Sequence, residues 1–263
     1  DIDTPVSLML KLTGAAENAF VLESVTGGEV RGRYSIIGMK PDLIWRCRGE
    51  TSAINRAARF DADAFEDVPG NPLDTLRQVI AESKIDLPDD LPQAAAGLFG
   101  YLGYDMIRLV EHLPNVNPDV LGLPDAQMLR PSVIAVLDGV KGEVIVISPA
   151  WANSGLTARA AYAQAAERVA DALRELDRPA VAGINEVAEV APSEPVSNMS
   201  KEAYFEIVEK AKEYIRAGDI YQANLTFRAA AQYAGHPLAL YAAVRDRAKA
   251  GYGGVVFDGQ NWM

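Results

Sequence analysis

The segment from residue 19 to residue 38 constrains the fold of this chain more than any other stretch. An apolar run ending at Leu22 stops at the polar pair Glu23 and Ser24, and after two adjacent glycines the chain returns through Arg33. Two strands joined by a glycine-containing loop are the pattern of a β-hairpin. A carboxylate and a hydroxyl at a strand end, faced by a guanidinium on the return strand, could hold the ammonium and carboxylate of an amino acid. The alternative is that Glu23 and Arg33 form an ordinary surface ion pair, which contributes about 0–1 kcal/mol.

The two ends of this segment, LES and GRYSIIG, resemble the N-terminal signature of the large subunit of anthranilate synthase, a chorismate-utilising enzyme. In that family the segment lines an allosteric pocket for tryptophan. The resemblance implies that Glu23, Ser24 and, more loosely, Arg33 contribute to such a pocket. It also implies an intertwined sandwich of sheets with outer helices.

The residues themselves predict an α+β fold of mostly antiparallel sheets with helices outside. Hairpins are expected at 20–38 and 132–148, and the helices are clustered rather than placed after every strand. Apolar periodicity and capping residues predict helices from Thr4–Pro5, from 71 to 80, from 156 to 176, from Ser200 to 217 and from Pro237 to about 249, with further strands at 43–48, 220–228 and 252–258.

Glycines at 97, 100 and 103 punctuate an apolar run. The spacing is not the dinucleotide fingerprint, because that motif needs a different glycine interval and a following helix. Glycines in a strand indicate that another part of the backbone passes close by. Asp105 and Arg108, just after this run, are expected to tie the turn together structurally.

A second stretch, EKAKEYIRAGDIYQANLTFR at 209–228, resembles the start of the chorismate-binding domain shared by anthranilate synthase and aminodeoxychorismate synthase. Prolines and acidic residues interrupt any periodicity before it. We therefore expect an N-terminal regulatory region at 1–178, a linker at 179–199 and the truncated start of the chorismate-binding domain at 200–263.

The C-terminal stretch leaves the choice of enzyme open. GDIYQANLTFR and AGYGGVVFDGQNW resemble aminodeoxychorismate synthase more than anthranilate synthase. Anthranilate synthases usually carry N-P-S-P-Y-M here, and only its tyrosine, Tyr252, is retained. The resemblance places Tyr252 in the tryptophan pocket. Gly253 stands where a methionine would contact the indole ring, which weakens the expected binding.

Composition excludes several classes of function. The net charge of −11 and pI near 4.7 argue against nucleic acid or an anionic membrane as partner. The N-terminus lacks the basic flank of a signal peptide, so we expect a cytoplasmic protein. With one cysteine, Cys47, and two histidines, a zinc site is not expected, and Cys47 reads as a packed strand thiol.

The resemblance implies an enzyme that converts chorismate and ammonia, supplied from glutamine by an amidotransferase subunit, into anthranilate and pyruvate. Chorismate carries two carboxylates, so its site needs cationic donors and a metal, expected to be Mg²⁺. The family's motifs for this chemistry are not found in the sequence, so no catalytic or metal-binding residue is assigned. We expect a fragment that is inactive alone. The alternatives are aminodeoxychorismate synthase component I, in the folate pathway, and a non-catalytic amino-acid-binding module.

Overall fold

The computed structural model describes residues 3–14, 16–24, 32–114, 118–151, 155–179, 193–248 and 251–263. They fall into two compact units: a larger one of Asp1–Val181 with Tyr241–Met263, and a smaller one of Ala182–Leu240. The two glycines at 27–28, expected to turn the first hairpin, lie outside the described residues.

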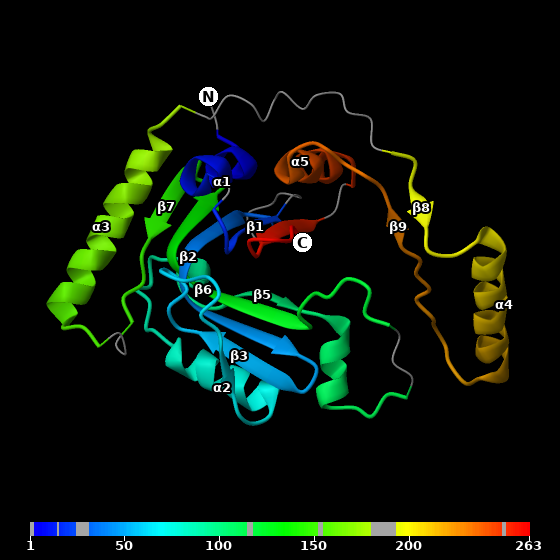
Figure 1. The fold of residues 1–263 in the computed structure, drawn as a ribbon. Helices are drawn as coiled ribbons and strands as arrows, with labels where there is room; N and C mark the ends of the chain where they lie inside the picture. Colours follow the sequence, from blue (N-terminus) through cyan, green and yellow to red (C-terminus); the bar gives the residue numbers. More distant parts are fainter. Residues whose placement is uncertain are drawn as a thin grey trace. The chain divides into compact units, whose positions relative to one another are not determined.

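The larger unit is built on one eight-stranded sheet (Figure 1). Its strands run in the order β10-β1-β2-β3-β4, and β6 adds to β2 and carries β5 and β7. All of the pairings are antiparallel, which confirms the expected α+β fold. The strands are β1 Ala19–Ser24, β2 Tyr34–Arg48, β3 Thr51–Asn55, β4 Glu66–Val68, β5 Phe99–Leu102, β6 Ala126–Asp138, β7 Glu143–Ile147 and β10 Tyr252–Phe257.

Both predicted hairpins are confirmed. β1 returns as β2 with Phe20 opposite Gly38, and β6 returns as β7 with Ile134 opposite Ile147. Gly38 leaves room for the ring of Phe20: an added Cβ would come within 2.2 Å of that ring, which would then have to shift. The predicted strand at 43–48 is the second half of β2, which continues past an irregularity between Pro41 and Leu43.

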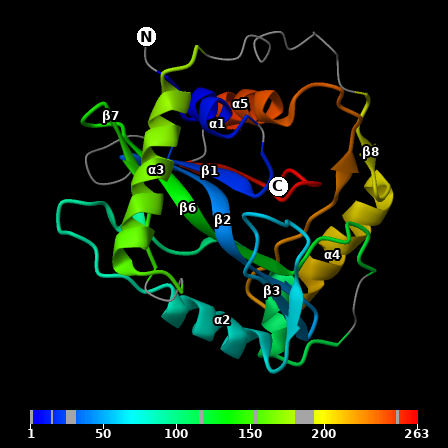
Figure 2. The same cartoon turned by 60° about the vertical axis from the view of Figure 1, so that its left-hand side comes forward.

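Two of the helices begin where the capping residues predict: Thr4 and Asn71 each accept a backbone N–H of the first turn. Thr157 caps α3 in the same way, and this helix begins at Ala158, two residues after the predicted start. α1 and α3 lie beside the β1–β2 and β6–β7 parts of the sheet, and α2 lies beside β2 and β3 (Figures 1 and 2). The elements are α1 Pro5–Thr13, α2 Pro72–Glu82, α3 Ala158–Leu176, α5 Pro237–Ala248 and the short 3₁₀ helices η1 Gln93–Ala95 and η2 Tyr104–Leu109.

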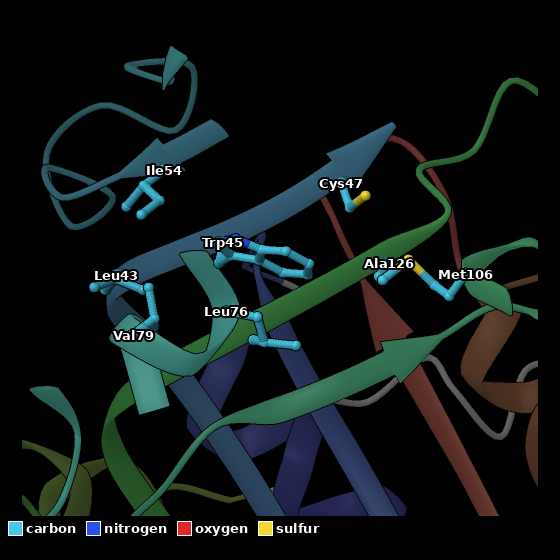
Figure 3. Packing of buried hydrophobic residues seen from close by; sticks show 8 residues of the cluster. All are labelled: Leu43, Trp45, Cys47, Ile54, Leu76, Val79, Met106 and Ala126. Carbon is cyan, nitrogen blue, oxygen red and sulfur yellow. The ribbon is translucent and has the colours of Figure 1, made fainter. Parts of the chain in front are cut away.

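One hydrophobic cluster joins α2 to the far end of β2 (Figure 3). Trp45 is fully buried there, and its Nε1 donates to Thr75 Oγ1 at 3.0 Å. Cys47 is buried in the same cluster, and this burial raises the pKa of its thiol to about 11. A thiol with that pKa is protonated at neutral pH, so Cys47 packs as an apolar side chain, as the sequence predicted.

The glycine run packs as expected at two of its three positions. An added Cβ at Gly100 would lie 1.9 Å from the Gln127 carbonyl oxygen, and one at Gly103 would lie 2.7 Å from that of Asp125. Gly97 differs from these two, because an added Cβ there would meet no atom closer than 4.0 Å. Its φ of +146°, which other residues rarely adopt, is what favours a glycine at this position. After the run, Arg108 Nε donates to Asp105 at 2.7 Å and Nη1 donates to the Leu113 carbonyl at 3.0 Å, which is a structural role.

The smaller unit contains α4 Lys201–Ala217 and a two-stranded ladder of β8 Val196–Ser197 and β9 Ala229–Ala230. Ser200 caps α4 and Gly218, with φ +81°, ends it, as predicted. The predicted strand at 220–228 is wrong, because no described strand lies alongside it to complete a ladder. The apolar side of α4 is exposed: Ile207 is 40% and Tyr214 44% accessible. Most of the predicted linker, 180–192, lies outside the described residues.

Within the described chain, the helices are too short or too polar to cross a bilayer.

Candidate functional site

The predicted site residues lie where β1 and β10 pair at the edge of the large sheet. The register places Ser24 opposite Tyr252 and Glu23 opposite Gly253. Side chains directly opposite each other share a face of the sheet, whereas successive side chains point to opposite faces. Ser24 and Tyr252 therefore form one pair on one face, and Glu23 lies on the other face.

The face of Ser24 and Tyr252 continues into an apolar cluster. Phe20 and Val256 belong to this cluster, with Leu22 packed against it. Ser24 is half-buried at its rim, and Tyr252 is 70% exposed. Hydroxyl groups next to an apolar surface suit a ligand that has an apolar body and a polar end.

Glu23 faces α5 and is almost fully buried, with 5% of its side chain exposed. Its Oε1 accepts a hydrogen bond from Arg245 Nη1 at 3.0 Å. Tyr241 lies one helical turn before Arg245, and burial together with the nearby Glu23 carboxylate raises the pKa of its hydroxyl. In both ribbon views the end of α5 is close to β1 (Figures 1 and 2). The carboxylate thus points away from the Ser24–Tyr252 face.

Arg33 does not face Glu23. Its Nε lies 3.0 Å from both carboxylate oxygens of Asp138, and its Nη2 lies 2.6 Å from Oδ2. The reason is strand order: β2 pairs with β6 as well as β1, and Tyr34 lies opposite Asp138. The guanidinium and the backbone N–H groups of Val140 and Lys141 hold the pKa of Asp138 well below its usual value. The expectation of a Glu23–Arg33 surface pair is wrong.

Tyr241 and Arg245 were missed by sequence reasoning. They stand four residues apart on one helix, so they project from the same side. A carboxylate at the end of an apolar strand does signal a need for a counter-ion. Nothing in the sequence spacing, however, singles out an arginine 222 positions away.

Gly253 has a physical explanation in this arrangement. An added Cβ at this position would lie 3.0 Å from the hydroxyl oxygen of Tyr241. The space beside the strand is therefore taken by the tyrosine of α5. A larger residue would have to displace it.

The resemblance implies a Mg²⁺ ion, but the described residues do not form a set of side chains that could bind it. No three Asp, Glu, His or Cys side chains come together among them as a possible metal site. The described residues do not fit the ion, and no chemical step is derived through it.

Comparison with known proteins gives a consistent family. The family model described as chorismate binding enzyme matches residues 39–261. The chain is 65% identical over 247 residues to anthranilate synthase component 1 of Cereibacter sphaeroides, covering 93% of this chain and 49% of that protein. It is 33% identical over 245 residues to the protein of the same name from Thermus thermophilus, again covering 93% and 49%.

A solved structure extends the comparison to three dimensions. The crystal structure of anthranilate synthase component I from Streptococcus pneumoniae TIGR4 superposes with a TM-score of 0.67 at 25% identity, covering 94% of this chain and 51% of that one. The resemblance to the anthranilate synthase large subunit is confirmed, and the chain spans about half the length of these relatives. With most of its length matched by the family model, the chain belongs to the chorismate binding enzyme family.

Proposed function

We propose that this chain is part of an anthranilate synthase component I, which converts chorismate and ammonia into anthranilate and pyruvate in tryptophan biosynthesis. The observation that carries the proposal is the 65% identity to the Cereibacter sphaeroides protein across 93% of the chain. Identity at this level over almost all of the chain favours a shared reaction, not a shared fold alone.

The same proposal includes the partners of the reaction. A glutamine amidotransferase subunit supplies the ammonia, Mg²⁺ assists at the chorismate carboxylates, and the enzyme acts in the cytoplasm. Two carboxylates on one substrate need cationic donors and a metal. Because the described residues bring no metal donors together, the proposal assigns no catalytic residue to this chain.

The proposal further includes a feedback site for tryptophan at the paired ends of β1 and β10. Ser24 and Tyr252 are its contact residues, since they share a face next to an apolar cluster. Arg33 contributes positive charge from the β2 side, reduced by its pairing with Asp138. Glu23 belongs to the site from the opposite face, through its ion pair with Arg245.

The activity is tested with the full-length protein that carries this chain, supplied with chorismate, an ammonium salt and Mg²⁺. We expect anthranilate fluorescence and an equal amount of pyruvate. Consumption of chorismate to an amino-chorismate without pyruvate would favour aminodeoxychorismate synthase instead. No consumption of chorismate, with tryptophan still bound, would favour the non-catalytic module. Inhibition by added tryptophan, measured in the same assay, tests the feedback site.

A further inference from the structure

The buried cluster of Glu23, Tyr241 and Arg245 lies behind the face of Ser24 and Tyr252, and Glu23 is its only member assigned to the proposed tryptophan site. Arg245 is 18% exposed, and its guanidinium is oriented from two sides. Nη1 donates to Glu23 at 3.0 Å and Nε donates to Asp246 at 3.1 Å. The cluster therefore connects the end of β1 to α5 through one directed contact.

Two polar atoms in this cluster remain unsatisfied. Glu23 Oε2 and the Tyr241 hydroxyl are both buried and make no hydrogen bond of good geometry with the described residues, although the Glu23 carboxylate is close enough to raise the pKa of that hydroxyl. Tyr241 also lies against Gly253, the residue opposite Glu23 in the sheet. The tyrosine thus lies against both the carboxylate of Glu23 and the backbone of β10.

A buried ion pair such as Glu23–Arg245 is expected to fix the positions of its side chains more than it raises the free energy of unfolding. Desolvation offsets much of the attraction in a buried ion pair, so the pair adds little net stability. Loss of one partner, in contrast, leaves an uncompensated charge that must move towards water. The position of Glu23, and with it the end of β1, depends on Arg245.

We propose that Arg245 and Tyr241 are positioning residues of the tryptophan site, which they act on through Glu23. By holding Glu23 towards α5, they fix the position of the end of β1, where the pairing with β10 places Ser24 on the opposite face beside Tyr252. A ligand at Ser24 and Tyr252 is then coupled to α5 through the same contact. This inference rests on the feedback site of the proposed function.

The test measures tryptophan inhibition of the full-length enzyme with ammonia as the nitrogen donor. Arg245→Gln should raise the half-inhibitory tryptophan concentration about tenfold, a usual size for coupling between two sites. This rise should exceed any change in the KM for chorismate. Arg245→Lys keeps the charge and should restore part of the sensitivity. Arg247→Gln, an exposed arginine on the same helix, is the matched control and should change neither quantity.

Two further comparisons separate a positioning role from a general loss of structure: the variant Tyr241→Phe, and Arg245→Gln combined with Glu23→Gln. Tyr241→Phe should reduce sensitivity less than Arg245→Gln, because it removes no charge. In a Glu23→Gln background, Arg245→Gln should have almost no further effect on inhibition, since residues acting through one contact are not additive.

The outcomes separate the two proposals. If wild-type enzyme is not inhibited by tryptophan, the feedback site itself is wrong, and the inference falls with it. If wild-type enzyme is inhibited and Arg245→Gln and Arg245→Lys keep its sensitivity, the feedback site stands and the positioning role is wrong. If Arg245→Gln does not fold, the test uses Arg245→Lys and Tyr241→Phe. Lower sensitivity to tryptophan in both variants would support the inference, and wild-type sensitivity in both would contradict it. Additive effects of Arg245→Gln and Glu23→Gln would also contradict the inference.

Discussion

Asp138 shows how the fold sets the charge of a single residue. Its side chain is 2% exposed, yet it receives a bidentate contact from Arg33 and two backbone hydrogen bonds. Hydrogen bonds to a carboxylate favour its charged form, and here they outweigh burial. Asp138 is therefore ionised at neutral pH and ties the start of β2 to the end of β6.

A pH dependence follows from this lowered pKa. The folded pKa lies below the unfolded value of about 3.9, so the unfolded state binds more protons between the two values. The contribution of Asp138 to stability is complete above about pH 5 and is lost as the pH falls through the unfolded pKa towards the folded one. Asp138→Asn should lower the free energy of unfolding at pH 7, and the difference should narrow on acidification.

Urea unfolding at several pH values measures this difference. Asp171→Asn is the control, since Asp171 pairs with Arg174 on an exposed side of α3. The assignment of a lowered pKa to Asp138 would be contradicted by one result. In that result, the difference in the free energy of unfolding between Asp138→Asn and wild type stays constant down to pH 2, well below the unfolded pKa of about 3.9.

Ser24 gives the second prediction at this scale. A hydrogen bond to a charged ligand group contributes about 1.5–3 kcal/mol, so Ser24→Ala should weaken tryptophan binding roughly ten- to a hundred-fold. Calorimetry on the full-length protein measures this. Ser35→Ala, on the other face of the neighbouring strand, should bind as wild type does. Binding unchanged in Ser24→Ala would remove Ser24 from the site.

Among the elements, β5 depends on contact between backbones more than on side chains. It adds to β6 with Gly100 opposite Met128, and the Gln127 carbonyl occupies the space of a side chain at Gly100. A flexible side chain could move aside, but a carbonyl within a paired strand cannot move without disrupting its ladder. The glycine is therefore a condition for this pairing.

Gly100→Ala should destabilise the protein by about 3 kcal/mol, the upper end of the usual cost of overpacking. Gly139→Ala is the matched control, because its Cβ would meet only the Arg33 carbonyl at 3.3 Å. The midpoint of urea unfolding compares the two. An equal, small shift for both variants would show that β5 can move away from β6 at little cost.

On the scale of the whole molecule, distant parts of the sequence share one sheet. Residues 241–263 belong to the same unit as residues 1–181, because β10 pairs with β1 along six residue positions. The stretch 200–263, expected to begin one domain, thus contributes α4 to the smaller unit and β10 to the larger one. The candidate site depends on this pairing.

This chain alone should not convert chorismate with ammonia and Mg²⁺. The reason for this expectation is that the family's motifs for binding chorismate and its metal are not found in the sequence. The measurement is anthranilate fluorescence, with the full-length protein as positive control. Fluorescence that increases in proportion to the added chain would overturn the prediction.

The sequence by itself determined the features that rest on local interactions. Capping by Thr4, Asn71 and Ser200, the two hairpins and the close backbone approach at Gly100 follow from a few adjacent residues, and all are present. The tertiary structure alone decided which charges meet. Arg33 binds Asp138 across 105 positions and Glu23 binds Arg245 across 222, because strand order and the placement of α5 bring them together. The attraction between two charges depends on their distance in space and not on their separation along the chain. Arg33 lies closer to Glu23 in sequence than Arg245 does, yet Glu23 binds Arg245.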